Sequence, residues 1–335
     1  MSVISFTSLK GGVGKTSLSV NVAHAFACRG CRTLLIDCDP AAHATRLFTK
    51  HDAARTNSAA LAKLFLNREI LTEESDEERL SLFDQLLDLD GLCENVRPSL
   101  DLIVGGSELR HLIWGVGAKA FAKLFPQLIH NLYDEYDQII IDTPPDFNVI
   151  TRNAIAAADL AVVPVDASEM AIWSLEELVE NARHIQRPRW AIVRTMVNRS
   201  ASRVRALGAE RMTANLNLDA SQELGSSEQD IATKDSFLSL LRSCEKKNKA
   251  ADPALKKTID TRPIYLLHAM IYRTEQQNQL SFLSQTAFDR KQAATLAENY
   301  LHVAREIEEL ITITQKLPDD LLPEIDLGFS QQLAG

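Results

Sequence analysis

The sequence predicts a doubly wound α/β fold, in which helices cover both faces of a mostly parallel β-sheet. Three observations predict it. Short apolar runs alternate with segments of helical periodicity, a glycine-rich turn joins the first run to the first helix, and aspartates directly follow two later runs. Because ligands of such folds bind at the carboxyl ends of the strands, the aspartates also indicate where a site lies.

The expected elements follow from periodicity. The apolar runs are short and continuous, which is typical of strands buried on both faces. The first helix places Leu18, Val22 and Ala25 at helical spacing. Strands are expected at 3–7, 33–36, 100–104, 138–141, 160–164 and 190–197, and helices at 16–28, 119–132, 175–185 and 296–310.

Composition excludes several classes of protein. Of 335 residues, 45% are hydrophobic and 24% are charged, which excludes a disordered, a collagen-like and a disulfide-rich chain. Five cysteines fit a reducing compartment. We find no apolar run long enough to span a bilayer and no signal peptide, so a cytoplasmic protein without a transmembrane helix is expected.

Charge is unevenly distributed, although the whole chain carries a net charge of −9. Residues 69–101 are strongly acidic, whereas residues 183–211 and 242–262 are basic. Each segment is compatible with an ordinary solvated helix face. Together, the two basic segments favour a surface that meets a polyanion, and the acidic segment either avoids nucleic acid or contacts a basic partner.

The glycine-rich turn has the composition of a phosphate-binding loop. It reads KGGVGKTS and lies between a strand and a helix, so its backbone N–H groups can surround an anion at a helix N-terminus. The Lys15 ammonium is expected to reach the β- and γ-phosphates of a bound nucleotide, and the Thr16 hydroxyl to bind Mg²⁺. The predicted nucleotide-binding residues of the loop are Gly11, Gly12, Val13, Gly14, Lys15, Thr16 and Ser17.

Aspartates complete the predicted site. Asp37 and Asp39 follow the second strand, and Asp142 follows a run of three isoleucines. One carboxylate would bind Mg²⁺ through water and another would orient the attacking water, although such residues also serve as helix caps. The predicted metal set is Thr16, Asp37, Asp39 and Asp142.

These motifs resemble the ParA/MinD-type deviant Walker P-loop ATPases, and most closely the ParA partition ATPases. The resemblance is carried by Lys10 in the loop, by Asp39-Pro40, by residues 142–145 and by residues 153–159 with the VVPV run after them. It covers residues 1–50 and 136–200 well. It implies an ATP-dependent sandwich homodimer in which Lys10 contacts the phosphates bound by the other subunit.

The resemblance also implies roles for residues and partners. Lys10, Lys15 and Asp39 would be catalytic, and Asn198 would contact the adenine. The ATP-bound dimer would bind DNA non-specifically on the nucleoid, and a ParB-like or cargo-adaptor protein would stimulate hydrolysis, so that plasmid or chromosomal DNA is segregated. Candidate DNA contacts are Arg199, Arg203, Arg205, Arg273, Arg290 and Lys291.

Other functions remain open within the resemblance. The cargo could be a protein assembly such as a carboxysome or a chemoreceptor cluster. A MinD-like membrane role is disfavoured, because the sequence has no Lys or Arg after Lys316. A nucleotide-switched scaffold is the remaining alternative. It is motivated by Ala41. After Asp39-Pro40 the family often has Gln and Gly, whereas this chain has Ala41, Ala42 and then His43, so hydrolysis is expected to be slow or partner-dependent.

We expect one ATPase domain over residues 1–315. It would carry insertions at about 51–99 and 200–262 and an acidic tail at 316–335. Cys28 and Cys31 form a CxxC pair without a second pair, so neither a zinc site nor a redox role is favoured. No helix-turn-helix is expected before the first strand.

Overall fold

The computed structural model describes residues 1–49, 60–73, 75–166, 168–185, 189–197, 264–272 and 285–315. Within these residues, eight strands form one sheet of order β3-β4-β2-β5-β1-β6-β7-β8, and every neighbouring pair except β3–β4 is parallel. The strands are β1 Ser2–Phe6, β2 Thr33–Asp37, β3 Cys93–Arg97, β4 Leu100–Ile103, β5 Gln138–Asp142, β6 Leu160–Val165, β7 Arg189–Val197 and β8 Ile264–Tyr272. The predicted fold class is confirmed.

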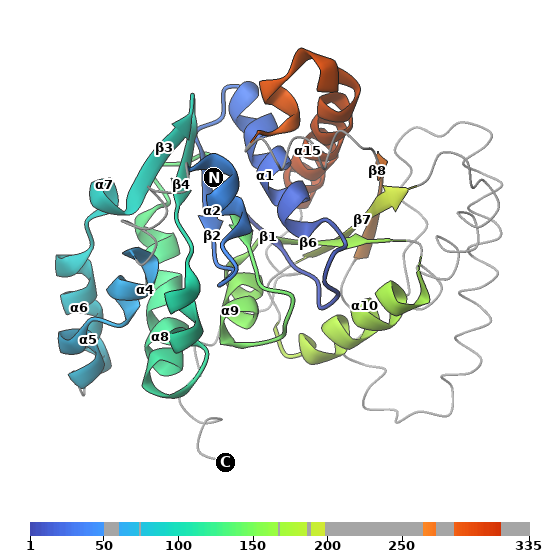
Figure 1. Cartoon of the computed structure of the whole chain (residues 1–335). Coiled ribbons are helices and arrows are strands. Elements are labelled where there is room, and N and C mark those ends of the chain that lie inside the picture. Colours follow the sequence, from blue (N-terminus) through green and yellow to red (C-terminus); the bar gives the residue numbers. More distant parts are fainter. Residues whose placement is uncertain are drawn as a thin grey trace, which may run out of the picture.

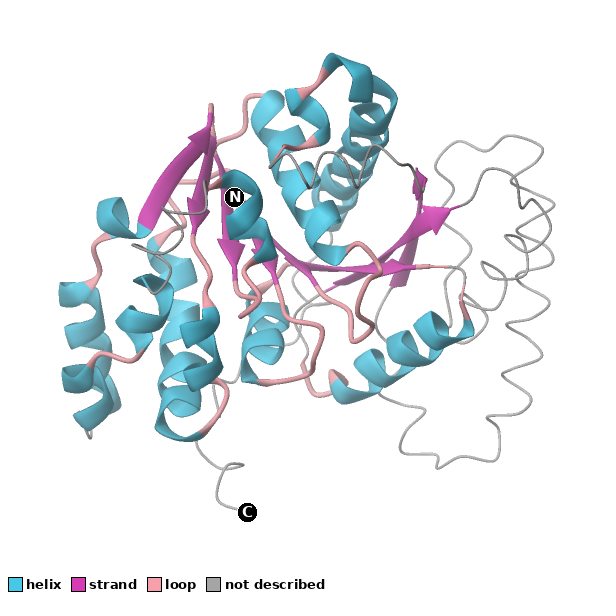
Figure 2. Cartoon of the chain, in the orientation of Figure 1, coloured by secondary structure: helices cyan, strands magenta, loops and turns pink. Residues whose placement is uncertain are grey.

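Helices lie on both faces of the sheet (Figures 1 and 2). The α-helices are α1 Lys15–Cys28, α2 His43–Phe48, α4 Ala60–Phe65, α5 Arg68–Thr72, α6 Asp76–Leu86, α7 Leu89–Leu92, α8 Gly115–Asn131, α9 Val149–Ala157, α10 Glu169–Asn181 and α15 Ala294–Gln315. Three 3₁₀ turns are described as well: η1 Ser107–Leu112, η2 Ala287–Asp289 and η3 Lys291–Ala293. None of these described helices is both long and apolar enough to span a bilayer.

Alternate residues of the central strands enter different cores. Ile4 and Phe6 of β1 pack in the core beneath α1 and α15, whereas Val3 packs in the core on the opposite face with α8 and α9. Ile140 and Ile141 of β5 divide in the same way. Both faces are therefore apolar, which explains why these strands appear in the sequence as continuous apolar runs.

The strand register places the ends of β1, β2 and β5 at the same edge of the sheet. Phe6 of β1 pairs with Asp142 of β5, and Asp37 of β2 pairs with the same residue from the other side. The central strands therefore end level with one another, and the loops that follow them meet at the carboxyl edge of the sheet.

The ten expected elements are all present, and most bounds agree within a few residues. Helix α10 begins six residues earlier than expected, because the Ser168 side chain caps it by accepting a hydrogen bond from the Ala171 N–H. Strands β3 and β8, the helices α2, α4 to α7 and α9, and the 3₁₀ turns had not been assigned. The described part of the expected insertion at 51–99 contains α4 to α7 and β3, whereas the insertion at 200–262 and the tail lie outside the described residues.

The C-terminal elements are tied to α1 by polar contacts. The Asn21 side chain accepts a hydrogen bond from the Ala287 N–H at 2.8 Å, and His24 Nδ1 lies 2.7 Å from the Thr286 hydroxyl. The Asp289 carboxylate accepts two hydrogen bonds from Arg97 of β3, at 3.0 and 3.1 Å. These contacts join the first helix, an edge strand and the segment before α15 into one body.

An aromatic cluster joins α4 to α8. The Phe121 ring lies 4.8 Å from the rings of both Phe65 and Phe125, and the Phe83 ring of α6 lies 5.8 Å from that of Phe65. All four side chains are fully buried. The cluster therefore anchors the α4–α6 segment to the main core.

We predict that Phe121→Ala lowers the free energy of unfolding by about 3–5 kcal/mol, because it opens a cavity in the centre of this cluster. Urea denaturation followed by circular dichroism measures the change. Trp114→Ala is the control, since that side chain is 80% exposed and its loss is expected to change stability by no more than about 0.5 kcal/mol. Equal effects of the two substitutions would contradict the prediction.

Candidate nucleotide site

The loop between β1 and α1 has an open backbone. Gly12 and Gly14 adopt φ angles of 77° and 86°, in the left-handed region that favours glycine. Helix α1 begins after Gly14 with no side-chain cap and no acidic residue in its first turn. Its first N–H groups and the positive end of its dipole are therefore available to an anion, as the sequence predicts.

Lys15 reaches from the start of α1 to the end of β5. Its side chain is only 7% exposed, and its ammonium donates a hydrogen bond to the Thr143 carbonyl and lies 3.4 Å from Asp142 Oδ1. The Thr143 hydroxyl in turn donates to the Phe6 carbonyl at 2.9 Å. The lysine is thus a buried cation held at the carboxyl ends of β1 and β5.

Two fully buried carboxyls lie side by side in the sheet. Burial raises the pKa of Asp37 to about 7, and the neighbouring Asp142 charge adds to this, while hydrogen bonds from Thr45 oppose it. Burial also raises the pKa of Asp142, against the effect of the Lys15 ammonium. Burial is the main cause of both shifts, because it disfavours the charged form of a carboxyl.

The residues fit a hydrated Mg²⁺ ion. Asp142 Oδ2 is buried and has no hydrogen-bond partner among the described residues, so it remains available to a metal-bound water. In those same residues, no group of three or more His, Cys, Asp or Glu side chains could hold a metal alone. Mg²⁺ is commonly held by one or two carboxylates together with substrate phosphates and water, and Asp142 offers such a carboxylate.

Asp39 organises the loop after β2. Its Oδ1 accepts a hydrogen bond from the Ala41 N–H at 2.8 Å, and its carbonyl accepts one from the Ala42 N–H. Ala42 has a φ of 53°, and the exposed His43 begins α2 directly after it. Asp39 therefore fixes the turn that leads from β2 into α2, at the same edge as Asp37.

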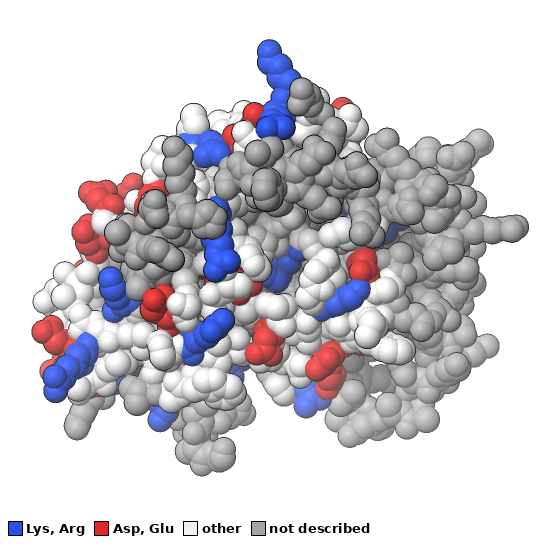
Figure 3. Space-filling model, viewed as in Figure 1, with Lys and Arg blue, Asp and Glu red and all other residues white. Residues whose placement is uncertain are grey.

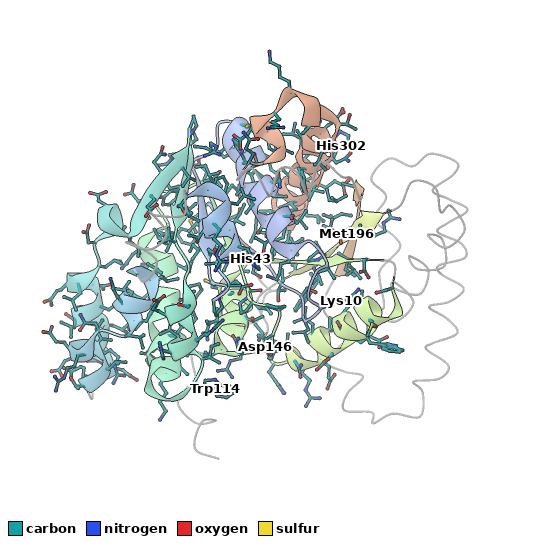
Figure 4. All side chains as sticks on the ribbon, in the orientation of Figure 1. Lys10, His43, Trp114, Asp146, Met196 and His302 are labelled. Atoms are coloured by element: carbon teal, nitrogen blue, oxygen red, sulfur yellow. The ribbon has the colours of Figure 1, made fainter. Side chains whose placement is uncertain are left out.

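Lys10 is held at the rim of the site by its own chain. Its ammonium donates to Asp166 Oδ2 and to the Ser168 hydroxyl, the latter at 2.8 Å. Ser168 also caps α10, and its hydroxyl and N–H both donate to Asp166 Oδ1. The two loop lysines thus occupy different places, with Lys15 buried over β5 and Lys10 partly exposed beside the start of α10 (Figure 4).

Three residues of the site had not been singled out in the sequence. Asp166 directly follows β6, so the rule that selected Asp37 and Asp142 could have found it. Thr45 donates two hydrogen bonds of 2.8 Å to Asp37 Oδ2, from its N–H and its hydroxyl. Gly105 donates to the Thr45 hydroxyl, and a Cβ there would lie 2.4 Å from the Asp37 carbonyl oxygen. No local sequence signal marks these last two.

The predicted adenine and DNA contacts are mostly untested by the structure. Asn198, Arg199, Arg203, Arg205 and Arg273 lie outside the described residues. Arg290 donates to Gln285 at 2.6 Å, and Lys291 is exposed beside it. Figure 3 shows acidic and basic side chains interspersed on the face in view, without a continuous basic stripe among the described residues there.

The CxxC pair has no activated thiol. Burial is the main cause that raises the pKa of both Cys28 and Cys31. Reactive cysteines have a lowered thiol pKa instead. Both residues are free cysteines, with Cys28 exposed and Cys31 partly buried.

A glycine-rich loop before a helix, a buried lysine on that loop and carboxyls at the ends of parallel strands define a P-loop nucleotide-binding protein. Known proteins agree with this class. Residues 1–192 match the sequence family described as an AAA domain, and the chain belongs to that family. Its relatives place it among the ParA/MinD-type P-loop ATPases, as the motifs predict.

Three comparisons are the most informative. The chain is 30% identical over 213 residues to the chromosome partitioning protein ParA of Caulobacter vibrioides. The match covers 60% of this chain and 71% of that protein. The chain is 28% identical over 188 residues to the sporulation initiation inhibitor protein Soj of Bacillus subtilis, and that match covers 55% and 66%. The chain thus spans about two thirds of the length of these relatives. An ATP complex of a McdA variant from Cyanothece has the same fold, with a TM-score of 0.58, 15% identity and coverage of 91% and 96%.

We predict that the raised pKa of Asp37 makes the stability of the protein without nucleotide fall as pH rises from 5 to 8. At a pH between the ordinary pKa of an aspartate and about 7, Asp37 keeps its proton in the folded state but has lost it in the unfolded chain. The free energy of unfolding is therefore highest at low pH and decreases as the pH rises through the folded pKa. Urea denaturation at four pH values measures the slope.

Asp37→Asn is expected to flatten this slope, because an amide does not titrate. Asp146→Asn serves as the matched control, since Asp146 is exposed on the loop after β5 (Figure 4). A slope that is the same in wild type and in Asp37→Asn would show that Asp37 does not carry the effect.

Proposed function

We propose that this chain is a ParA-like ATPase that dimerises on binding ATP, binds DNA non-specifically and uses partner-stimulated hydrolysis to segregate plasmid or chromosomal DNA. The observation that carries the proposal is the pair of lysines on one phosphate loop. Lys15 lies inside the site, whereas Lys10 is held at its rim by Asp166. Membership of the same family as ParA supports it.

Binding of ATP would begin at the loop. The N–H groups at the start of α1 would donate to the phosphates, and the Lys15 ammonium would turn from the Thr143 carbonyl toward the β- and γ-phosphate oxygens. A triphosphate carries more charge than the carbonyl and carboxylate that hold the lysine here, so this exchange of partners is favourable.

Hydrolysis would rest on the carboxylates and on charge compensation. Bound Mg²⁺ supplies positive charge to the β- and γ-phosphate oxygens, and Thr16 and Asp142 would hold it, the latter through water. Asp39 would orient the attacking water from the loop after β2. Asp37 fixes this loop by accepting from Thr45 and from the Asp39 N–H at 3.2 Å.

The dimer would form around Lys10. To reach the phosphates of a second subunit, Lys10 must leave Asp166 and Ser168, so the ion pair at the rim competes with dimer formation. The γ-phosphate of ATP offers the compensating charge across the interface. DNA binding on the nucleoid would then depend on ATP, and a ParB-like or cargo-adaptor protein would end it by stimulating hydrolysis.

We predict that Lys15→Ala weakens ATP binding at least about a hundredfold, because it removes the buried cation from the site. Asp39→Asn is expected to keep ATP affinity within about threefold but to slow turnover at least about tenfold. Isothermal titration calorimetry and a phosphate-release assay measure the two quantities.

His43→Ala is the matched control for the loop after β2. Its side chain is exposed, so wild-type turnover is expected. Turnover that persists in Asp39→Asn would remove Asp39 from the catalytic role. A wild-type protein that binds ATP without any turnover would favour the nucleotide-switched scaffold.

We predict that a labelled random-sequence DNA duplex binds the protein with ATP but not with ADP, and that salt weakens the binding. Fluorescence anisotropy at two salt concentrations measures this, and Lys15→Ala is expected to abolish it. If no nucleotide supports DNA binding while the ATP dimer still forms, the DNA function is wrong, and positioning of a protein cargo on another surface becomes the better candidate.

A further inference from the structure

Strand β7 is irregular where it passes the phosphate loop. Its pairing with β8 shifts register, so that between the partners of Met270 and Tyr272 it has two residues, Thr195 and Met196, where β8 has one. Met196 has a φ of 54°, which is strained for a residue with a side chain. Such bulges are common beside active sites, where they redirect a side chain.

The bulge directs the Thr195 hydroxyl to the phosphate loop. Thr195 is 3% exposed, and its Oγ1 donates a hydrogen bond to the Val13 carbonyl at 2.7 Å. This contact joins residues that are 182 positions apart in the sequence. Val13 lies between Gly12 and Gly14, which adopt left-handed conformations and, as glycines, have a flexible backbone. A hydrogen bond from outside the loop therefore restricts the backbone where it is most flexible.

The peptide plane carries this restraint to the site. The Val13 carbonyl and the Gly14 N–H belong to one trans peptide, so they point in opposite directions. When Thr195 holds the carbonyl on the β7 side, the Gly14 N–H points away from β7. Gly14 is the residue from which α1 starts, so this N–H belongs to the group that faces a bound phosphate.

Met196, the other residue of the bulge, lies near Gly14. Its Cε lies 3.5 Å from the position that a Cβ would take on Gly14. Figure 4 shows Met196 at the end of β7, next to the loop that carries Lys10. Thr195 and Met196 thus lie next to the two residues that the Val13–Gly14 peptide joins.

We propose that Thr195 is a positioning residue of the nucleotide site, whose hydroxyl holds the Val13 carbonyl and so directs the Gly14 N–H at the phosphates. The proposal rests on the nucleotide binding proposed above. In this proposal Thr195, which lies outside the loop, raises the affinity of the loop for any nucleotide that has α- and β-phosphates.

The test compares Thr195→Val, which keeps the shape and removes the donor, with Thr195→Ser, which keeps the donor. Isothermal titration calorimetry gives the Kd for ATP and for ADP with Mg²⁺, and the melting temperature without nucleotide is measured for each protein. Thr195→Val is expected to weaken both nucleotides about tenfold, because both carry the α- and β-phosphates. Thr195→Ser is expected to stay within about twofold of wild type.

Thr33→Val is the matched control. Its hydroxyl is also fully buried and donates to a backbone carbonyl, that of Cys31 at 3.0 Å, but it lies at the start of β2, away from the loop. It is expected to leave both Kd values unchanged whatever it does to the melting temperature. If Thr195→Val does not fold, Thr195→Cys replaces it with the same expected loss, because a thiol is a weak donor.

The outcomes are distinct. Wild-type affinity in Thr195→Val, a loss that Thr195→Ser does not restore, or an equal loss in Thr33→Val each overturns the positioning role while nucleotide binding stands. A wild-type protein that binds neither ATP nor ADP overturns the proposed function and this inference with it.

Discussion

The parallel pairing of β2 with β5 places Asp37 directly beside Asp142, and both carboxyls are fully buried. Two carboxylates at such close quarters repel each other and lose most of their hydration, so folding must either protonate one of them or bring positive charge to them. The raised pKa of Asp37 reflects the first solution, and the Lys15 ammonium over Asp142 is part of the second. Several residues of the site therefore serve to stabilise the two carboxyls that this register brings together.

The surrounding elements can be understood from that charge. Thr45 donates twice to Asp37, and Gly105 leaves room for the Asp37 backbone while donating to Thr45. Lys10 is compensated separately by Asp166, so the loop carries two cations that do not share one anion. A magnesium nucleotide would bring both a cation for the carboxylates and anions for the lysines, so the charges of the site suit it.

Much of this could be predicted from the sequence, because the decisive signals are local. The KGGVGKTS loop, the aspartates after β2 and β5 and the alternation of strands and helices are all read within short windows. What could not be predicted depends on contacts between distant segments. Thr45 and Thr195 are ordinary threonines until the fold brings them to Asp37 and Val13. Strand β3 was missed because it is a half-buried, polar edge strand without a continuous apolar run.

The order of the strands separates what must stay fixed from what is able to change. The strands that lead into the site, β1, β2, β5 and β6, are neighbours in the middle of the sheet, whereas β3 and β8 form its edges. Between consecutive strands that the structure describes, the two longest stretches of sequence join β2 to β3 and β7 to β8, and both lead to an edge strand. A change in the length of either connection would therefore enter the sheet at an edge strand, away from the central carboxyls.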